Sequence, residues 1–149
     1  MDDVRKTLDG LAGYFIEDLS VGMSAAYAKT ITDADIVLFA GVSGDTNPVH
    51  MNEDYARGTM FGGRIAHGML SASFISTVMG TRLPGPGCIY MTQNLRFKAP
   101  VRVGDTVVAR VTVAELMPEK RRAVMQTVCT VGKTVVIEGD ALVMVPSRV

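Results

Sequence analysis

The sequence of 149 residues predicts an α+β domain in which an antiparallel sheet packs against one long buried helix. The most apolar stretch, residues 67–81, has apolar side chains on several faces, which is typical of a helix buried on several sides. After Gly87 the apolar residues recur with a period of two, in four segments joined by short links. Such links are too short for parallel crossovers, so the strands are expected to be antiparallel.

The first half of the chain predicts short elements around polar loops. Thr32 is expected to cap a helix whose first turn carries Asp33 and Asp35, because acidic side chains favour the positive end of a helix dipole. That helix should end before Gly44. In order, the expected elements are a tail at 1–13, a single domain from 14 to 149, a strand at 25–31, the helix from 33, a loop at 45–48, a helical turn at 52–56 and a loop at 61–64.

The second half predicts the sheet. A Leu-Pro-Gly-Pro-Gly run at 83–87 terminates the buried helix. Residues 131–134, Val-Gly-Lys-Thr, fit a two-residue hairpin turn. The expected strands are 89–98, 106–116, 123–131 and 134–145.

Composition excludes several classes of function. Lys plus Arg number 15 and balance 15 Asp plus Glu, which argues against nucleic acid and anionic membrane as partners. The two cysteines form no disulfide framework and no C-x-x-C metal motif. No signal peptide or membrane span is recognised, so a cytoplasmic location is expected.

Asp45 and His50 are the first candidates for chemistry. A carboxylate and an imidazole held on one loop are able to grip the same water and move protons. Spacing alone favours a simpler interpretation, in which residues 45–48 are only a turn. A calcium loop is excluded because His50 stands where glycine is needed, and zinc is disfavoured by two separated histidines without a nearby cysteine.

Gly68 stands at the start of the predicted buried helix. The first N–H groups of a helix have no internal partner, and together with the dipole they favour developing negative charge. A glycine here lets a ligand oxygen approach closely, although tight packing alone explains it equally well. His67, next to it, is more often structural than catalytic in such a position.

Four segments together resemble one family. They are Phe15-Ile-Glu-Asp-Leu-Ser-Val-Gly22, Gly44-Asp-Thr-Asn-Pro-Val-His50, Arg64-Ile-Ala-His-Gly-Met-Leu70 and Phe97-Lys-Ala-Pro-Val-Arg-Val-Gly-Asp105. Across residues 14–145 the chain is similar to the R-specific enoyl-CoA hydratases, the MaoC-like dehydratases. The resemblance implies a hot-dog fold, an antiparallel sheet wrapped around a central helix. It also implies a homodimer with active sites near the subunit interface.

The resemblance also implies an activity and its residues. Asp45 and His50 would be the catalytic pair, Asn47 a supporting residue of the same loop, and Gly68 the oxyanion-binding N–H. The expected reaction is hydration of a trans-2-enoyl-CoA to the (R)-3-hydroxyacyl-CoA, with no cofactor and no metal. Which of Asp45 and His50 takes the first proton stays open.

Chain length and substrate carrier are open as well. By resemblance, Ser76 and Met79 line the acyl pocket, although Met79 fits plain core equally well. The alternatives are a 3-hydroxyacyl-carrier-protein dehydratase, a hydratase of branched or dicarboxylic enoyl-CoA, and, less favoured, a thioesterase or a non-catalytic acyl-CoA-binding subunit. Arg57, Arg64, Arg82, Lys98 and Arg102 are the cations considered for the CoA phosphates, with none preferred.

Overall fold

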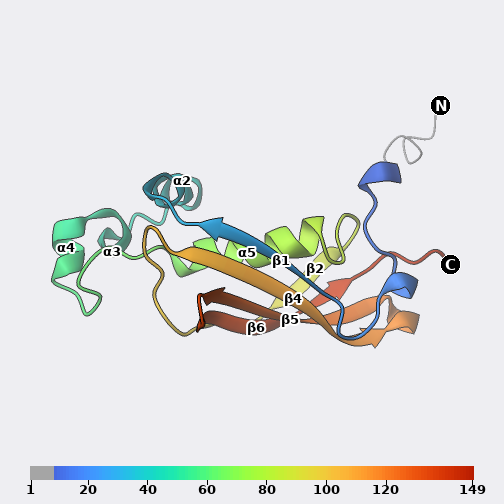
Figure 1. Ribbon diagram of the computed structural model, residues 1–149. Coiled ribbons are helices and arrows are strands. Elements are labelled where there is room, and N and C mark those ends of the chain that lie inside the picture. Colours follow the sequence, from blue (N-terminus) through green and yellow to red (C-terminus); the bar gives the residue numbers. More distant parts are fainter. Residues whose placement is uncertain (1–8) are drawn as a thin grey trace, which may run out of the picture.

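The fold is an antiparallel sheet curved around one central helix, as Figure 1 shows for the computed structural model. The structure describes residues 9–149, so most of the predicted tail lies outside the described residues. The central helix, α5 (Gly68–Thr81), matches the predicted helix at 67–81. It packs against the sheet, and the predicted hot-dog arrangement is confirmed.

All sheet pairings are antiparallel, which confirms the prediction from link length. The order is β1-β4-β5-β6-β2, and β3 also pairs with β6. The hairpin between β5 and β6 turns at Gly132 and Lys133, with Gly132 at φ 57°. The strands are β1 (Ser24–Thr30), β2 (Ile89–Gln93), β3 (Arg96–Phe97), β4 (Thr106–Met117), β5 (Arg122–Val131) and β6 (Thr134–Met144).

The strand expected at 89–98 is split into β2 and β3. Asn94 lies between them, donates its backbone N–H to the Asp140 carbonyl at 2.9 Å, and hydrogen-bonds the Asp140 side chain through its amide. Its backbone approaches Gly139 of β6 so closely that a Cβ at Gly139 would overlap it. The glycine therefore makes room for a local break in the edge of the sheet.

The core lies between α5 and the concave face of the sheet. Phe74, Ile75 and Val78 of α5 are buried there, and alternate residues of β4 and β5 meet them. This period-two burial is what the apolar pattern predicts. Among residues 9–149, no helix is long and apolar enough to cross a membrane.

Three shorter helices follow β1 in the chain, and Ile36 of the first of them is buried in this core. Helix α2 (Asp33–Ser43) begins as predicted, because the Thr32 side chain accepts from the Asp35 N–H at 3.2 Å and the Asp35 carboxylate accepts from the Thr32 N–H at 2.9 Å. Helices α3 (Pro48–Met51) and α4 (Glu53–Arg57) follow at one end of the molecule, opposite the C-terminus (Figure 1). Short 3₁₀ turns complete the chain at Asp9–Leu11, Ile16–Asp18 and Pro118–Lys120.

Helix α3 was not expected, and it changes the setting of His50. The sequence predicted only a loop between Asp45 and Pro48 with a helical turn further on. In the structure Asn47 caps a short helix, with its side chain accepting from the Val49 N–H at 3.1 Å, and Pro48 occupies the first turn, where its missing N–H costs nothing. His50 is therefore held by a helix rather than by a loop.

Candidate active site

A pocket of about 360 Å³ opens at the N-terminal end of α5. Its wall is mainly apolar, with the main exceptions being His50, His67, Gly68, Ser71 and Lys98. An apolar cleft with a few convergent polar groups is the usual form of a small-molecule site. The other lining residues are Met60, Phe61, Ile65, Ala66, Phe97, Ala99, Pro100, Val101, Val136 and Ile137.

Asp45 lies on the short loop between α2 and α3. Gly44 ends α2 in the left-handed conformation at φ 77°, which turns the chain out of the helix and into this loop. The Asp45 Oδ1 accepts from the Asn47 N–H at 3.2 Å, and Asn47 in turn caps α3. Asn47 thus fixes the backbone between the two predicted catalytic residues; its own catalytic role stays a prediction.

One hydrogen bond orients the His50 ring, and another holds the His50 backbone. Its Nδ1 lies 2.8 Å from the Ile65 carbonyl oxygen, which accepts only from an N–H. The neutral ring therefore carries its proton on Nδ1 and keeps the Nε2 lone pair free to accept one. The Arg64 Nε donates to the His50 carbonyl at 2.6 Å and holds the backbone of α3 in place.

Asp45, His50 and His67 form one cluster. One polar side-chain atom of each lies within 4.8 Å of the others. The two imidazole rings stack with centroids 4.0 Å apart and planes at 29°. A carboxylate beside two imidazoles supplies groups that are able to accept and donate protons.

Gly68 is the first residue of α5, so its N–H has no acceptor within the helix. No residue in the range 9–149 accepts from it either. The Phe97 ring lies so close that a Cβ at position 68 would be 2.6 Å from Cδ1 and Cε1. The structure is therefore compatible with both interpretations of this glycine. Its N–H lies at the pocket wall, where a ligand oxygen would approach, and its lack of a Cβ allows the Phe97 ring to pack closely.

Ser76 and Met79 do not line this pocket. Met79 is 0% exposed within the core, and Ser76 is exposed in the single chain. Their assignment to an acyl pocket stays a prediction. Ser71, one turn beyond His67 on α5, lines the pocket instead.

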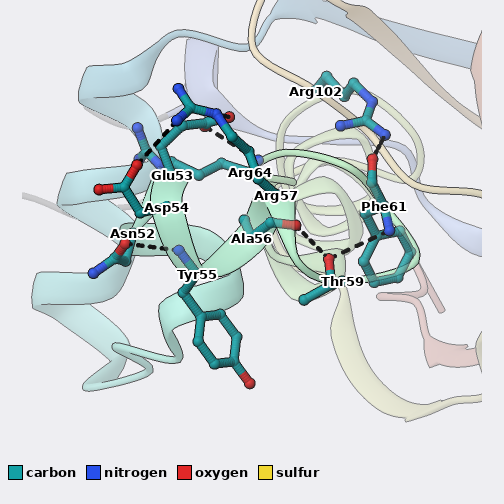
Figure 2. Close-up of polar contacts among 10 residues, drawn as sticks. All are labelled: Asn52, Glu53, Asp54, Tyr55, Ala56, Arg57, Thr59, Phe61, Arg64 and Arg102. Atoms are coloured by element: carbon teal, nitrogen blue, oxygen red, sulfur yellow. Dashed lines mark hydrogen bonds and ion pairs between the residues drawn. The ribbon is translucent and has the colours of Figure 1, made fainter.

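The five cations considered for the CoA phosphates all have protein partners. Figure 2 shows three of them: Arg57 beside Asp54, Arg64 near α4, and Arg102 donating to the Phe61 carbonyl beside the pocket. Lys98 alone of the five lines the pocket, and its ammonium lies 3.5 Å from Glu138. Arg57 pairs with Asp54, Arg64 with Asp33, and Arg82 donates to the Ala26 carbonyl.

Neither cysteine is poised as a nucleophile. Burial raises the pKa of Cys129 to about 12 and also raises the pKa of Cys88. A thiol attacks as the thiolate, so both stay unreactive near neutral pH. Neither cysteine is therefore a candidate for the chemistry of this pocket, and neither lines it.

Sequence reasoning missed the placement of two residues. His67 is 1% exposed and stacks on His50, although the residues are seventeen positions apart. The ring of Phe97, on β3, packs against Gly68 at the start of α5. The sequence offered one hint, that each of the two histidines of the chain lies near a predicted loop.

An acid–base cluster beside a free helix N–H, at the mouth of an apolar pocket, defines an enzyme site for an acyl substrate. Residues 20–138 match the MaoC-like domain. The chain is 63% identical to an (R)-specific enoyl-CoA hydratase of Rhodospirillum rubrum, over 94% of this chain and 97% of that protein. It is 52% identical to a 3-hydroxybutyryl-CoA dehydratase of Methylorubrum extorquens, over 90% of this chain and 85% of the other.

A solved structure agrees with these relatives. The unliganded R-hydratase of Pseudomonas aeruginosa superimposes with a TM-score of 0.86 at 44% identity, covering 91% of this chain and 88% of that one. The chain belongs to the MaoC-like dehydratase family. The family predicted from the four sequence segments is confirmed.

Proposed function

We propose that this protein is an (R)-specific enoyl-CoA hydratase, which adds water to a trans-2-enoyl-CoA and releases the (R)-3-hydroxyacyl-CoA. The observation that carries the proposal is the cluster of Asp45 and His50 beside the free N–H of Gly68, at one apolar pocket. The named activity of the Rhodospirillum rubrum relative supports it independently.

Asp45 and His50 activate the water in this proposal. A water that makes hydrogen bonds of about 2.8 Å to two groups bridges a gap of the size seen between these side chains. The Nε2 of His50 accepts a proton from that water, because Nδ1 already donates to Ile65. The hydroxyl oxygen then bonds to the β-carbon, and the Asp45–His50 pair returns the proton to the α-carbon on the same face.

Gly68 stabilises the charge that forms meanwhile. As the oxygen attacks the β-carbon, the π electrons move toward the thioester carbonyl and leave negative charge on its oxygen. The Gly68 N–H and the positive end of the α5 dipole act on that oxygen. Loss of one such donor typically costs about 10²–10³ in kcat.

The substrate site is proposed to be completed in a homodimer. In the single chain Asp45 is exposed, whereas charge stabilisation works best where water is excluded. The outer edge of the sheet at β2 presents Ile89, Tyr90 and Met91 to solvent, and an uncovered apolar edge strand favours pairing with another chain. Light scattering or sedimentation of the purified protein tests the dimer.

The hydratase assay is direct. Purified protein is mixed with crotonyl-CoA and with a series of longer trans-2-enoyl-CoA thioesters, and the loss of conjugated thioester absorbance is followed. Chiral analysis of the product is expected to give the R isomer. No turnover on any short or medium chain, or an S product, contradicts the proposal.

The carrier-protein alternative has an observation of its own. A mitochondrial 3-hydroxyacyl-[acyl-carrier-protein] dehydratase of Arabidopsis thaliana is 32% identical over 87% of this chain. The test supplies the same acyl group as a CoA thioester and as an acyl-carrier-protein thioester and measures kcat/KM for each. A higher kcat/KM on CoA supports the hydratase, and the reverse order supports the dehydratase.

A further inference from the structure

We propose that His67 is a positioning residue for the hydration reaction, fixing Asp45, His50 and Gly68 relative to one another. The inference rests on the proposed function, and it assigns a task to the one histidine that the mechanism above leaves unused. His67 is the residue immediately before α5 and is 1% exposed. It contacts the site in three ways.

The first contact holds the Asp45 backbone. The Nε2 of His67 lies 2.8 Å from the main-chain carbonyl oxygen of Asp45. A carbonyl only accepts, so Nε2 carries the proton and donates it. This bond joins the loop that carries the carboxylate to the start of α5, twenty-two residues further along the chain.

The second contact sets the plane of the His50 ring. The two rings stack at 4.0 Å, and Phe39 of α2 meets His67 at 4.9 Å with a tilt of 57°. The Nδ1–Ile65 bond fixes one atom of His50 but leaves the ring free to tilt about it. The stacked face of His67 restricts that tilt and so directs the free Nε2.

The third link is covalent, because His67 directly precedes Gly68. The Ala66 N–H on its other side donates to the Val101 carbonyl at 2.7 Å, which anchors this segment to the rest of the fold. One buried residue therefore connects the carboxylate loop, the imidazole and the helix start that supplies the N–H. Misplacement of reacting groups by about 1 Å costs as much as 10²-fold in rate.

His67 is not itself set up for proton transfer. Its Nε2 faces the main-chain oxygen of Asp45 and not the carboxylate, and its Nδ1 is buried with no hydrogen-bond partner within residues 9–149. With Nε2 bonded to the main chain and Nδ1 enclosed, the ring acts through its neighbours and not by exchanging protons with the substrate.

Three substitutions separate these tasks. His67→Gln places an amide N–H near the position of Nε2. In His67→Asn the side chain is shorter, so its amide does not reach the Asp45 carbonyl. His67→Phe keeps a ring but has no hydrogen-bond donor. We expect Asn and Phe to lower kcat by about 10–100-fold, with KM within about twofold. We expect Gln to recover about fivefold over Asn, the value of one net hydrogen bond of ~1 kcal/mol.

Val111→Ala serves as the matched control, because Val111 is 0% exposed on β4 and does not line the pocket. It is expected to lower Tm while kcat per folded molecule is unchanged. The pH profile of kcat/KM gives a further readout. In His67→Asn, the pH values at which kcat/KM rises and falls are expected to match those of the wild type. Loss of the rise or of the fall would make His67 a proton-transfer group and overturn the proposal.

Two other outcomes also overturn it. Equal kcat in His67→Asn and the wild type contradicts the positioning role. A loss of kcat in His67→Asn that is no larger than the loss in Val111→Ala at the same decrease in Tm contradicts it as well. Absence of turnover by the wild type instead contradicts the hydratase function itself. The wild-type assay thus distinguishes failure of the function from failure of this inference.

Discussion

The β4–β6 region and the segment from Gly44 to Ala66 are built on different principles. In β4–β6, almost every residue is paired with a neighbouring strand and alternate side chains enter the core. In residues 44–66, two short helices are held by individual polar contacts, several of which Figure 2 shows: Asn52 with the Tyr55 N–H, Thr59 with the Ala56 carbonyl, and Arg57 with Asp54.

This difference separates stability from chemistry. The sheet owes its stability to buried apolar area, which is distributed over many residues. The segment that carries Asp45 and His50 depends on a few directional bonds, each worth about 1 kcal/mol. Substitutions in the sheet should therefore reduce stability first, and substitutions in the segment should reduce activity first.

The largest effect is expected at the acid–base pair. Asp45→Ala and His50→Ala should each lower kcat by about 10²–10⁴, the usual contribution of a positioned acid or base. The crotonyl-CoA assay gives kcat, and circular dichroism melting should show a fold that survives. A full rate in either variant would show that the residue is not catalytic.

The sheet should behave in the opposite way. Met125 of β5 is 0% exposed, and Met125→Ala leaves a cavity that should lower the free energy of unfolding by about 2–5 kcal/mol. Urea unfolding measures this loss. The kcat per folded molecule should stay near that of the wild type; a large fall in kcat would break the separation of the two regions.

Gly68 lies where the two regions meet. Gly68→Ala should lower kcat by about 10²-fold, because the added Cβ enters the pocket wall beside the N–H and overlaps Phe97. Tm should change little, because Phe97 is 55% exposed and its ring is free to move aside. The double variant Gly68→Ala, Phe97→Leu relieves the overlap, and recovery of full activity in it would assign the loss to Phe97 instead of the N–H.

Arg64 gives a smaller effect. Its Nε donates to the His50 carbonyl at 2.6 Å while its Nη1 pairs with Asp33 at 2.8 Å, a fork that lysine cannot reproduce. Arg64→Lys should lower kcat by about tenfold through a shifted α3. Asp33→Asn removes only the exposed ion pair and should stay within about twofold; equal losses would mean that the bond to His50 is unimportant.

The smallest effect is expected far from the site, where Asp18 pairs with Arg148 at 2.7 Å. The hydrogen bond from Arg148 holds the pKa of Asp18 below its usual value. The pair therefore stabilises the fold above the unfolded-state pKa, and this contribution is lost as pH falls through the lowered pKa. Asp18→Asn should lower Tm slightly near neutral pH, with the gap closing in acid; a gap that widens in acid contradicts this sign.

The same division explains what the sequence could predict. The strands, α5 and the Thr32 cap follow from periodicity and local chemistry, which are readable along the chain. Helix α3 was missed because four residues show no period, and only the Asn47–Pro48 pair marks its start. The break at Asn94 depends on Gly139, forty-five positions away, so no local pattern announces it.

The site was predictable as a set of residues but not as a geometry. Asp45, His50 and Gly68 were named from motifs, and the structure brings Asp45 and His50 together and sets His50 and Gly68 on one pocket. The stacking of His67 on His50 requires the folded backbone, because neither spacing nor composition relates residues in different elements. Ser76 and Met79 came from resemblance alone, and the single chain gives them no place in the pocket.

Ile65 has two roles, one through its backbone carbonyl and the other through its place in the pocket wall. Its carbonyl fixes the proton on His50, and its side chain lines the acyl pocket. Because any amino acid supplies the same carbonyl, the shape of the pocket at this position is able to change during evolution or engineering without altering the tautomer of the base. Selectivity for the acyl chain and competence for proton transfer can therefore be varied separately at a single codon.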